Sequence, residues 1–430
     1  MKPSDLIPLR WPAGPGEEWK KPESLGILDG TPFNCLVLES ASSGMVEAAR
    51  KRGLTVFGSA RGLDAGVTES TASQAGKATG DVIAVTGCDW PSVRVGRSGN
   101  AESGPTGYPW VNANGWISLL ASAQAPGKTI WTTAQPKDDS GPVRPEMYAL
   151  AVADSAAYGT RWLATLDSRT SAGLLKGEGP AKEAWTALVQ AVRFFEERRP
   201  RSIGQTFARL GILSDFAGLN EALAKEFLNL TLRRQLPSRI LDPGSVNKET
   251  LDGLKLVVVI DRKAPSGPVL KELEAFLASG GTVVLPVSAG HLAEGRSSAG
   301  KHNTGYSLFT SGSGMMAVAP KPWTNPYALA TDAHRLLSHS NDVVRLWNAG
   351  SSISYPQQVG AGTFAHVLNY TGRPVGHPMS LWVAMPFRQA RFFDLFGRSE
   401  ALEVISRTDG TEVSLPPFTS YAAVEFREKS

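Results

Sequence analysis

Three carboxylates, Glu39, Asp89 and Asp167, each follow a short apolar run in the first 170 residues. Hydrolysis of a glycosidic bond uses two such groups: one protonates the leaving oxygen, and the other acts as base or nucleophile. Because each carboxylate follows a different run, any two could form that pair. The candidate catalytic residues are therefore Asp89, Glu39 and Asp167.

Amides, indoles and one arginine accompany these carboxylates. Amide and guanidinium groups hydrogen-bond hydroxyls, and indoles offer a broad apolar face. The loop GYPWVNANGW, residues 107–116, is the densest example, with two indoles and two amides. The predicted substrate-binding residues are Trp11, Arg61, Trp90, Trp110, Asn112, Asn114, Trp116 and Gln135.

Each of these residues also has a structural interpretation. Asp89 and Asp167 could cap a following turn or helix, and Glu39 could bond backbone amides. The indoles could pack against the top of a sheet, and Asn112 and Asn114 could stabilise a turn before the next glycine. The sequence leaves both interpretations open for every candidate.

Apolar runs that alternate with helix-like segments must position these side chains. The runs show no apolar/polar alternation, which favours a parallel sheet covered on both faces. Such repeated units predict a (β/α)8 barrel, a TIM barrel, over residues 1–200, with its site at the carboxyl ends of the strands. A Rossmann sheet is the rival, but no GxGxxG turn follows an early strand. The runs are 6–11, 33–40, 54–60, 81–90, 108–116, 128–136 and 160–167, with 93–97 as a weak eighth.

Two further domains are predicted after the helix 183–200, which we expect Pro200 to end. Residues 201–345 again alternate strands and helices, which predicts an α/β, flavodoxin-like, doubly wound domain. Its residues 288–304 are expected to form a polar loop. Residues 346–430 contain short alternating strands with Gly and Pro turns, which predicts a small antiparallel β-sandwich.

Histidine and cysteine restrict the chemistry. All six histidines lie beyond residue 290, so the predicted barrel has no His-dependent triad or imidazole metal site. The two cysteines are too few for a disulfide scaffold or a four-Cys zinc site. His334 and His339 are five residues apart, which does not place them on one helix face. We predict no metal and no cofactor.

Charge and hydropathy indicate neither a nucleic-acid nor a membrane partner. The net charge is only +4, basic and acidic residues are interspersed, and no apolar run is long enough to span a bilayer. The opening MKPSDLIPLRWPAG lacks the apolar stretch of a secretory signal. We expect a cytoplasmic protein, or one whose leader was removed before this numbering.

The segments LDGLKLVVVID and LASGGTVVLPV, followed by FAHVLNYTG and VSLPPFTSYAAVEF, resemble the middle and last domains of family 42 β-galactosidases and related barrel glycoside hydrolases. The resemblance covers the whole chain as an order of domains. It implies a middle domain related to class I glutamine amidotransferases that carries no catalysis and serves in oligomer contacts. Residues 201–345 contain no cysteine and hence no amidotransferase nucleophile.

The catalytic pair of that family is not matched. The family places an acid/base Glu, preceded by Asn, after the fourth strand and a nucleophilic Glu after the seventh. Here the fourth predicted strand ends in Asp89, and Gln135 stands where the family has Glu. The leading hypothesis is a hydrolase of β-linked glycosides or oligosaccharides. The alternatives are a non-catalytic carbohydrate-binding relative, and a non-glycosidic barrel hydrolase or lyase.

Overall fold

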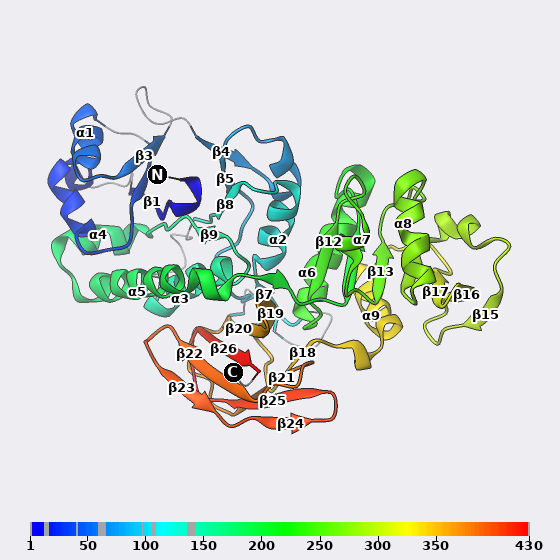
Figure 1. Ribbon diagram of the computed structural model, residues 1–430. Coiled ribbons are helices and arrows are strands. Elements are labelled where there is room, and N and C mark those ends of the chain that lie inside the picture. Colours follow the sequence, from blue (N-terminus) through cyan, green and yellow to red (C-terminus); the bar gives the residue numbers. More distant parts are fainter. Residues whose placement is uncertain are drawn as a thin grey trace.

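The computed structural model describes residues 2–12, 17–39, 42–58, 66–96, 98–104, 109–135 and 143–428. Its sheets form three groups along the chain, which occupy the upper left, the right and the bottom of Figure 1. The long helix α5 runs along the first group, between it and the C-terminal strands.

Within its described residues, the N-terminal part is built on seven short parallel strands. They form one sheet of three strands, in the order β1-β2-β3, and one of four, in the order β4-β5-β8-β9. A parallel bridge between Leu9 and Ala164 joins the two sheets, so neighbours in space follow chain order, as in a barrel. Within the described residues, no strand pairing joins β3 to β4. The strands are β1 (Pro8–Arg10), β2 (Cys35–Leu38), β3 (Thr55–Gly58), β4 (Val67–Ser70), β5 (Val82–Val85), β8 (Thr129–Thr132) and β9 (Arg161–Trp162).

The strand assignment differs from the prediction at two places. Strand β4 was not predicted, because its sequence VTES has a single apolar residue. The runs 93–97 and 108–116 are not strands of the parallel sheets: β6 (Ser92–Val93) and β7 (Val111–Asn112) pair with each other as an antiparallel ribbon. This ribbon is an excursion between β5 and the next helix, and the Val93 N–H donates to the carbonyl of Tyr370 in the C-terminal part.

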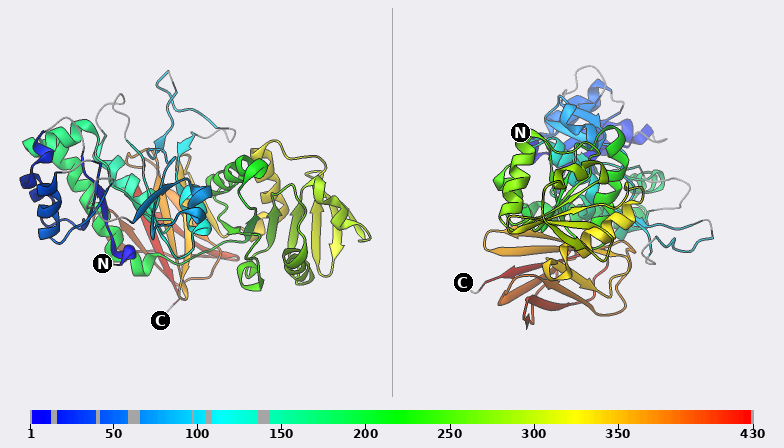
Figure 2. Two further views of the ribbon diagram at one scale, coloured as in Figure 1. Left: turned by 90° about the horizontal axis from the view of Figure 1, so that it is seen from above. Right: turned by 90° about the vertical axis from the view of Figure 1, so that its right-hand side faces the viewer.

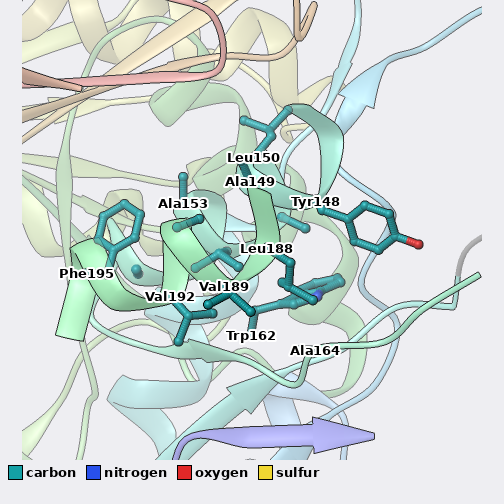
Figure 3. Close-up of a cluster of buried hydrophobic side chains, with 14 of the residues drawn as sticks. Tyr148, Ala149, Leu150, Ala153, Trp162, Ala164, Leu188, Val189, Val192 and Phe195 are labelled. Carbon is teal, nitrogen blue, oxygen red and sulfur yellow. The ribbon is translucent and has the colours of Figure 1, made fainter. Parts of the chain in front are cut away.

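Helices surround these strands, and their buried faces make the largest core cluster. Figure 3 shows part of this cluster, where α3, the residues around β9 and α5 meet. Helix α5 continues two residues past Pro200, contrary to the predicted stop, because a proline in the last turn costs little further helical bonding. The helices are η1 (Pro3–Asp5), η2 (Glu17–Lys20), η3 (Pro22–Leu28), α1 (Ser43–Lys51), η4 (Ala72–Lys77), α2 (Gly115–Gln124), α3 (Pro145–Ala156), α4 (Ser168–Lys176) and α5 (Gly179–Ser202).

The middle part contains a seven-stranded sheet in the order β12-β11-β13-β14-β17-β16-β15. The first five strands pair in parallel, and the last two are antiparallel. Residues 288–304, expected to be a loop, include most of η7 and the edge strand β15. The strands are β11 (Leu210–Leu213), β12 (Ser238–Leu241), β13 (Leu256–Val259), β14 (Thr282–Leu285), β15 (Ser298–Lys301), β16 (Ser307–Ser311) and β17 (Gly314–Val318). The helices are η6 (Gly218–Asn220), α6 (Glu221–Arg233), α7 (Lys248–Leu251), α8 (Gly267–Ala278), η7 (Val287–Ala293), α9 (Pro326–Leu337) and η8 (His339–Asn341).

The C-terminal part is two antiparallel sheets, β10-β19-β20-β26-β22-β23 and β18-β21-β25-β24, that enclose an apolar core. Its first strand, β10, comes directly after α5 and pairs with β19. The strands are β10 (Gln205–Thr206), β18 (Val344–Trp347), β19 (Ser352–Val359), β20 (Gly362–Asn369), β21 (Met379–Val383), β22 (Gln389–Asp394), β23 (Ser399–Leu402), β24 (Ile405–Arg407), β25 (Gly410–Leu415) and β26 (Tyr421–Arg427).

The three parts share cores across their boundaries. Helices α3 and α5 pack on the outer face of the six-stranded sheet through Tyr355, Phe364 and Tyr421. Helix α2 packs against α6 of the middle part, so that Ile117 and Phe227 belong to one cluster. Figure 2 shows the same arrangement from two further sides. Among the described residues, no helix combines the length and apolarity needed to cross a membrane.

Candidate functional site

Asp89 lies after the carboxyl end of β5 on a backbone that is held from both sides. The side chain of Asn114 accepts a hydrogen bond from the Asp89 N–H (2.9 Å) and donates one to the Asp89 carbonyl (2.8 Å). The carboxylate of Asp89 itself is exposed, and it has no hydrogen-bond partner within the described residues. An exposed acid on a fixed backbone is suited to proton transfer or charge stabilisation.

A buried network in turn fixes Asn114, which is 1% exposed. Asp154 Oδ2 accepts from the backbone N–H and the side-chain amide of Asn114, each at 2.9 Å. Its other oxygen accepts from the hydroxyl of Tyr370 at 2.5 Å. Burial raises the pKa of Asp154 to about 6, although these hydrogen bonds and the charge of Arg233 oppose the rise. Asn114 therefore links the Asp89 backbone to the C-terminal part.

Trp90, the residue after Asp89, packs its indole ring against other aromatic rings. Its ring lies edge-on to Tyr148 and to Trp162, each with ring centroids 5.5 Å apart. The indole nitrogens of Trp90 and Trp162 are buried, and neither has a hydrogen-bond partner among the described residues. These two indole N–H groups are therefore unsatisfied donors inside the protein. The thiol of Cys88 is not an alternative nucleophile, because burial raises its pKa to about 12.

Asp167 caps helix α4. Its Oδ1 accepts from the backbone N–H groups of Arg169 and Thr170, both at 2.9 Å. Its Oδ2 accepts from the hydroxyls of Tyr148 and Thr170, both at 2.6 Å. Figure 3 shows the Tyr148 ring extending away from the apolar cluster. Burial alone would raise the pKa of Asp167, but the bonds from Thr170 and Tyr148 lower it. The side chain is 4% exposed, so the structure favours the capping interpretation.

Glu39 lines a cleft of about 620 Å³ whose walls include the end of β3 and residues of β4. We call it the seam cleft. The side chain of Glu39 is half-exposed, and its Oε1 lies 2.9 Å from Nη1 of Arg10 in an ion pair. Glu69 of β4 lines the same cleft and is exposed; this carboxylate was missed because β4 was not predicted. The cleft thus collects two carboxylates and a guanidinium from three strands.

The remaining predicted residues do not form one group. Trp11 is buried in the core, where its indole donates to the carbonyl of Trp19, so the structure favours packing for this residue. Trp110 packs under the guanidinium of Arg233, whose carbon lies 3.9 Å from the ring centroid. Gln135 is exposed after β8. Asn112 is half-buried in β7, Trp116 packs between two cores, and Arg61 lies outside the described residues.

One group in the described residues has the donors of a metal site. His334, His339 and Asp342 bring their ligand atoms within 4.8 Å of one another. The two rings meet because α9 ends at Leu337 and Ser338 turns the chain back with a positive φ of 67°, which helical spacing did not predict. The guanidinium of Arg345 lies 2.9 Å from Asp342, so a cation there would meet a fixed positive charge.

The sequence matches no protein-family model and no curated protein. Solved structures are similar in fold. One is the alpha-L-fucosidase isoenzyme 2 from Paenibacillus thiaminolyticus, with a TM-score of 0.61, 11% identity, and coverage of 99% of this chain and 100% of that one.

Two other similar structures are longer than this chain. A catalytic mutant of a GH42 beta-galactosidase from G. stearothermophilus has a TM-score of 0.50 and 11% identity, and the match covers 90% of this chain and 66% of that one. A rhamnosidase from Novosphingobium sp. PP1Y has a TM-score of 0.52 and 11% identity, with 90% of this chain and 38% of that one covered. This chain therefore has a glycosidase-like architecture. At 11% identity the likeness shows the fold alone, and membership of family 42 does not follow from it.

Proposed function

We propose that this chain is a glycoside hydrolase that acts on a β-linked glycoside or oligosaccharide at the carboxyl ends of its N-terminal strands. The observation that carries the proposal is Asp89, an exposed carboxylate on a backbone held by Asn114. A catalytic acid needs this combination, since its position must be fixed while its oxygens stay free. The glycosidase-like architecture supports the choice of substrate class.

Glu39 is the proposed second carboxylate. It directly follows β2, in the three-stranded sheet that neighbours the sheet of β5. Its side chain is half-exposed, and Arg10 is its one partner within the described residues. Asp167 is the weaker choice, because five hydrogen bonds, including one from the Val143 N–H, already occupy its two oxygens. Trp90, the next residue after Asp89 and half-buried, is the proposed sugar contact closest in sequence to it.

The proposal includes the architecture that the sequence predicted. We propose that the seven parallel strands belong to a closed barrel over residues 1–200. The β12-β11-β13-β14-β17 order supports a flavodoxin-like domain over residues 201–345, since it is the 2-1-3-4-5 order of such sheets. Residues 346–430 would be the sandwich. Oligomer formation through the middle domain also stays a prediction, and light scattering that gives a strict monomer would contradict it.

Asp89→Asn tests the proposal. It keeps the shape of the side chain and the bonds of the backbone to Asn114, but removes the ionisable group. We expect hydrolysis of a cognate aryl glycoside to fall at least a hundredfold, as is typical for loss of a general acid or base. The assay is release of the aryl group across a panel of aryl β-glycosides.

Asp81→Asn is the matched control. Asp81 is an exposed carboxylate just before the same strand, at its amino end, and should leave the rate unchanged. Equal rates for wild type and Asp89→Asn would contradict the assignment of Asp89. Glu39→Gln, measured alongside, should also reduce the rate, whereas no change there would remove Glu39 as the partner.

A non-catalytic carbohydrate-binding protein is the second candidate. Asp167 is engaged as a helix cap, and Glu39 is paired with Arg10. Only Asp89 is then free among the three predicted acids, which favours binding without catalysis. Calorimetric binding of oligosaccharides with no turnover over the same panel would support this alternative.

A further inference from the structure

A second cleft lies where the three parts of the chain meet, away from Asp89. We call it the junction cleft; its volume is about 770 Å³. The loop before β7, the end of α6, helix α9 and the start of β19 all contribute to it. The residues that define it for the argument are Trp110, Arg233, Arg234, Tyr327, Trp347 and His377.

The charge of the junction cleft is of one sign. Two arginines, Arg233 and Arg234, and three histidines line it, and none of its described lining residues is Asp or Glu. The nearest acid behind the histidines, Asp342, is already bonded to His334 at 2.7 Å and to Arg345 at 2.9 Å. Asp154, behind Arg233, is fully buried and holds Tyr370 and Asn114. Because Glu226 and Asp154 both act on the charge of Arg233, the guanidinium of Arg234 carries the positive charge that is left for a ligand.

The two arginines differ in how they are engaged. Arg233 donates its Nε to Asn229 at 3.0 Å and also bonds the carbonyl of Val111, so it is held as part of the wall. Arg234 lies over the ring of Tyr327, with its guanidinium carbon 5.2 Å from the centroid. Its Nε is buried and has no hydrogen-bond partner among the described residues. The guanidinium forms no ion pair within the part of the chain that the structure describes, so its terminal nitrogens are the donors that an anionic ligand would engage.

An apolar platform lies in the same cleft. Trp347, at the end of β18, is 41% exposed, which is unusual for an indole in this chain. Trp110 and Tyr327 also line the cleft, but the two guanidinium groups cover them. Trp347 is thus the ring available to a ligand, and an exposed indole offers a sugar ring the apolar face that it stacks on.

We propose that the junction cleft binds an anionic saccharide, with Arg234 contacting a carboxylate or sulfate group and Trp347 lying against the sugar ring. The saccharide part of this assignment rests on the proposed function, whereas the anionic part rests on the cleft alone. A cation at His334, His339 and Asp342 is disfavoured by the arginines of the same cleft and by Arg345.

Calorimetry with three probes tests the proposal: trigalacturonate, a sulfated galactose trisaccharide and neutral galactotriose. Wild-type protein should bind at least one of the two anionic probes, and more weakly as salt is added. Arg234→Gln should weaken that binding roughly tenfold or more, the effect of losing one charged hydrogen bond. Trp347→Ala should weaken it several-fold.

Arg335→Gln is the matched control, because Arg335 is an exposed arginine of α9 that does not line the cleft. It removes the same charge nearby and should leave affinity within twofold. Thermal melts check that each variant is folded. The proposal is overturned if the wild type binds neither anionic probe. It is also overturned if Arg234→Gln binds an anionic probe as tightly as the wild type does.

Asp89→Asn separates this proposal from the proposed function. This variant should bind the anionic probe as the wild type does, even if it loses hydrolysis. A hydrolase without the predicted binding would overturn the junction-cleft assignment alone. Binding at the junction cleft without any dependence of hydrolysis on Asp89 would overturn the active-site assignment alone.

Discussion

At the scale of single residues, buried His366 makes the stability of the fold depend on pH. It is fully buried in β20, where Nε2 faces the carbonyl of Ser202 at 3.3 Å and Nδ1 faces the hydroxyl of Tyr421 at 2.8 Å. A neutral ring satisfies both partners by donating to the carbonyl and accepting from the hydroxyl. Burial lowers the pKa of His366 to about 3. The neutral form is therefore the one that the fold requires.

The sign of the pH effect follows from the two pKa values. Between the unfolded pKa of about 6.5 and the folded pKa, only the unfolded chain binds the proton, so stability falls as the pH drops below about 6.5. The loss from this residue is on the order of 1.4 kcal/mol per pH unit. His366→Gln keeps a donor and an acceptor and should remove this slope. Urea unfolding at pH 7.5, 6.0 and 5.0 measures it, and parallel curves for the two proteins would contradict the prediction.

At the scale of elements, Asp167 determines where α4 begins. Its carboxylate satisfies two N–H groups of the first turn and also the buried hydroxyl of Tyr148. An N-cap contributes roughly 0.5–2 kcal/mol. Without the carboxylate, the Tyr148 hydroxyl keeps the bond that it accepts from the backbone N–H of residue 167, but its own O–H donor is unpaired, which costs roughly 1–3 kcal/mol. Both effects are local to the junction of α3, β9 and α4.

We expect Asp167→Ala to destabilise the protein by about 1.5–5 kcal/mol, the sum of those two effects. The free energy of unfolding by urea at pH 7 measures this. The control is Ser42→Ala, since Ser42 caps α1 with one hydrogen bond, to the N–H of Met45, and lacks a buried partner. It should cost about 1 kcal/mol. Equal losses for the two variants would show that Tyr148 does not depend on Asp167.

At the scale of the whole molecule, Asp154 joins the parts of the chain. It extends from α3 to Asn114 at the start of α2 and to Tyr370 after β20, and Arg233 of α6 adds its charge. Its pKa of about 6 lies above the unfolded value of about 3.9, so the folded state keeps its proton longer. The stability that the raised pKa of Asp154 contributes is fully present below about pH 4 and is lost as the pH rises through 6. This dependence is opposite in sign to that of His366.

Asp154→Asn should therefore be more stable than the wild type at pH 7.5, by on the order of 3 kcal/mol for a shift of about two pKa units. The difference should vanish near pH 4. An amide fits the site, since its oxygen accepts from Asn114 and its nitrogen donates to the Tyr370 hydroxyl oxygen. Urea unfolding of both proteins at pH 4, 6 and 7.5 tests this. A variant less stable than the wild type at pH 7.5 would show that ionised Asp154 is favourable in the junction.

The sequence by itself determined the order of most elements, because that information is local: the buried run VIAV of β5, the run LVVV of β13 and the alternation around β20 each specify a strand from neighbouring residues. It also named Asp89 and placed it at a strand end. Strand β4, with one apolar residue, carried no such local signal, and Glu69 was missed with it.

Tertiary structure decided which side chains are free. Asp167 and Asp89 looked alike in sequence, each an acid after an apolar run, but the first is saturated by Thr170 and Tyr148, while the second has only its backbone held. Asn114 holds that backbone through Asp154, 40 residues away, and the junction cleft brings together Arg234 from the end of helix α6 and Trp347 from strand β18. Partners that distant are set by packing, since hydrogen bonds and burial depend on proximity in space and not on spacing along the chain.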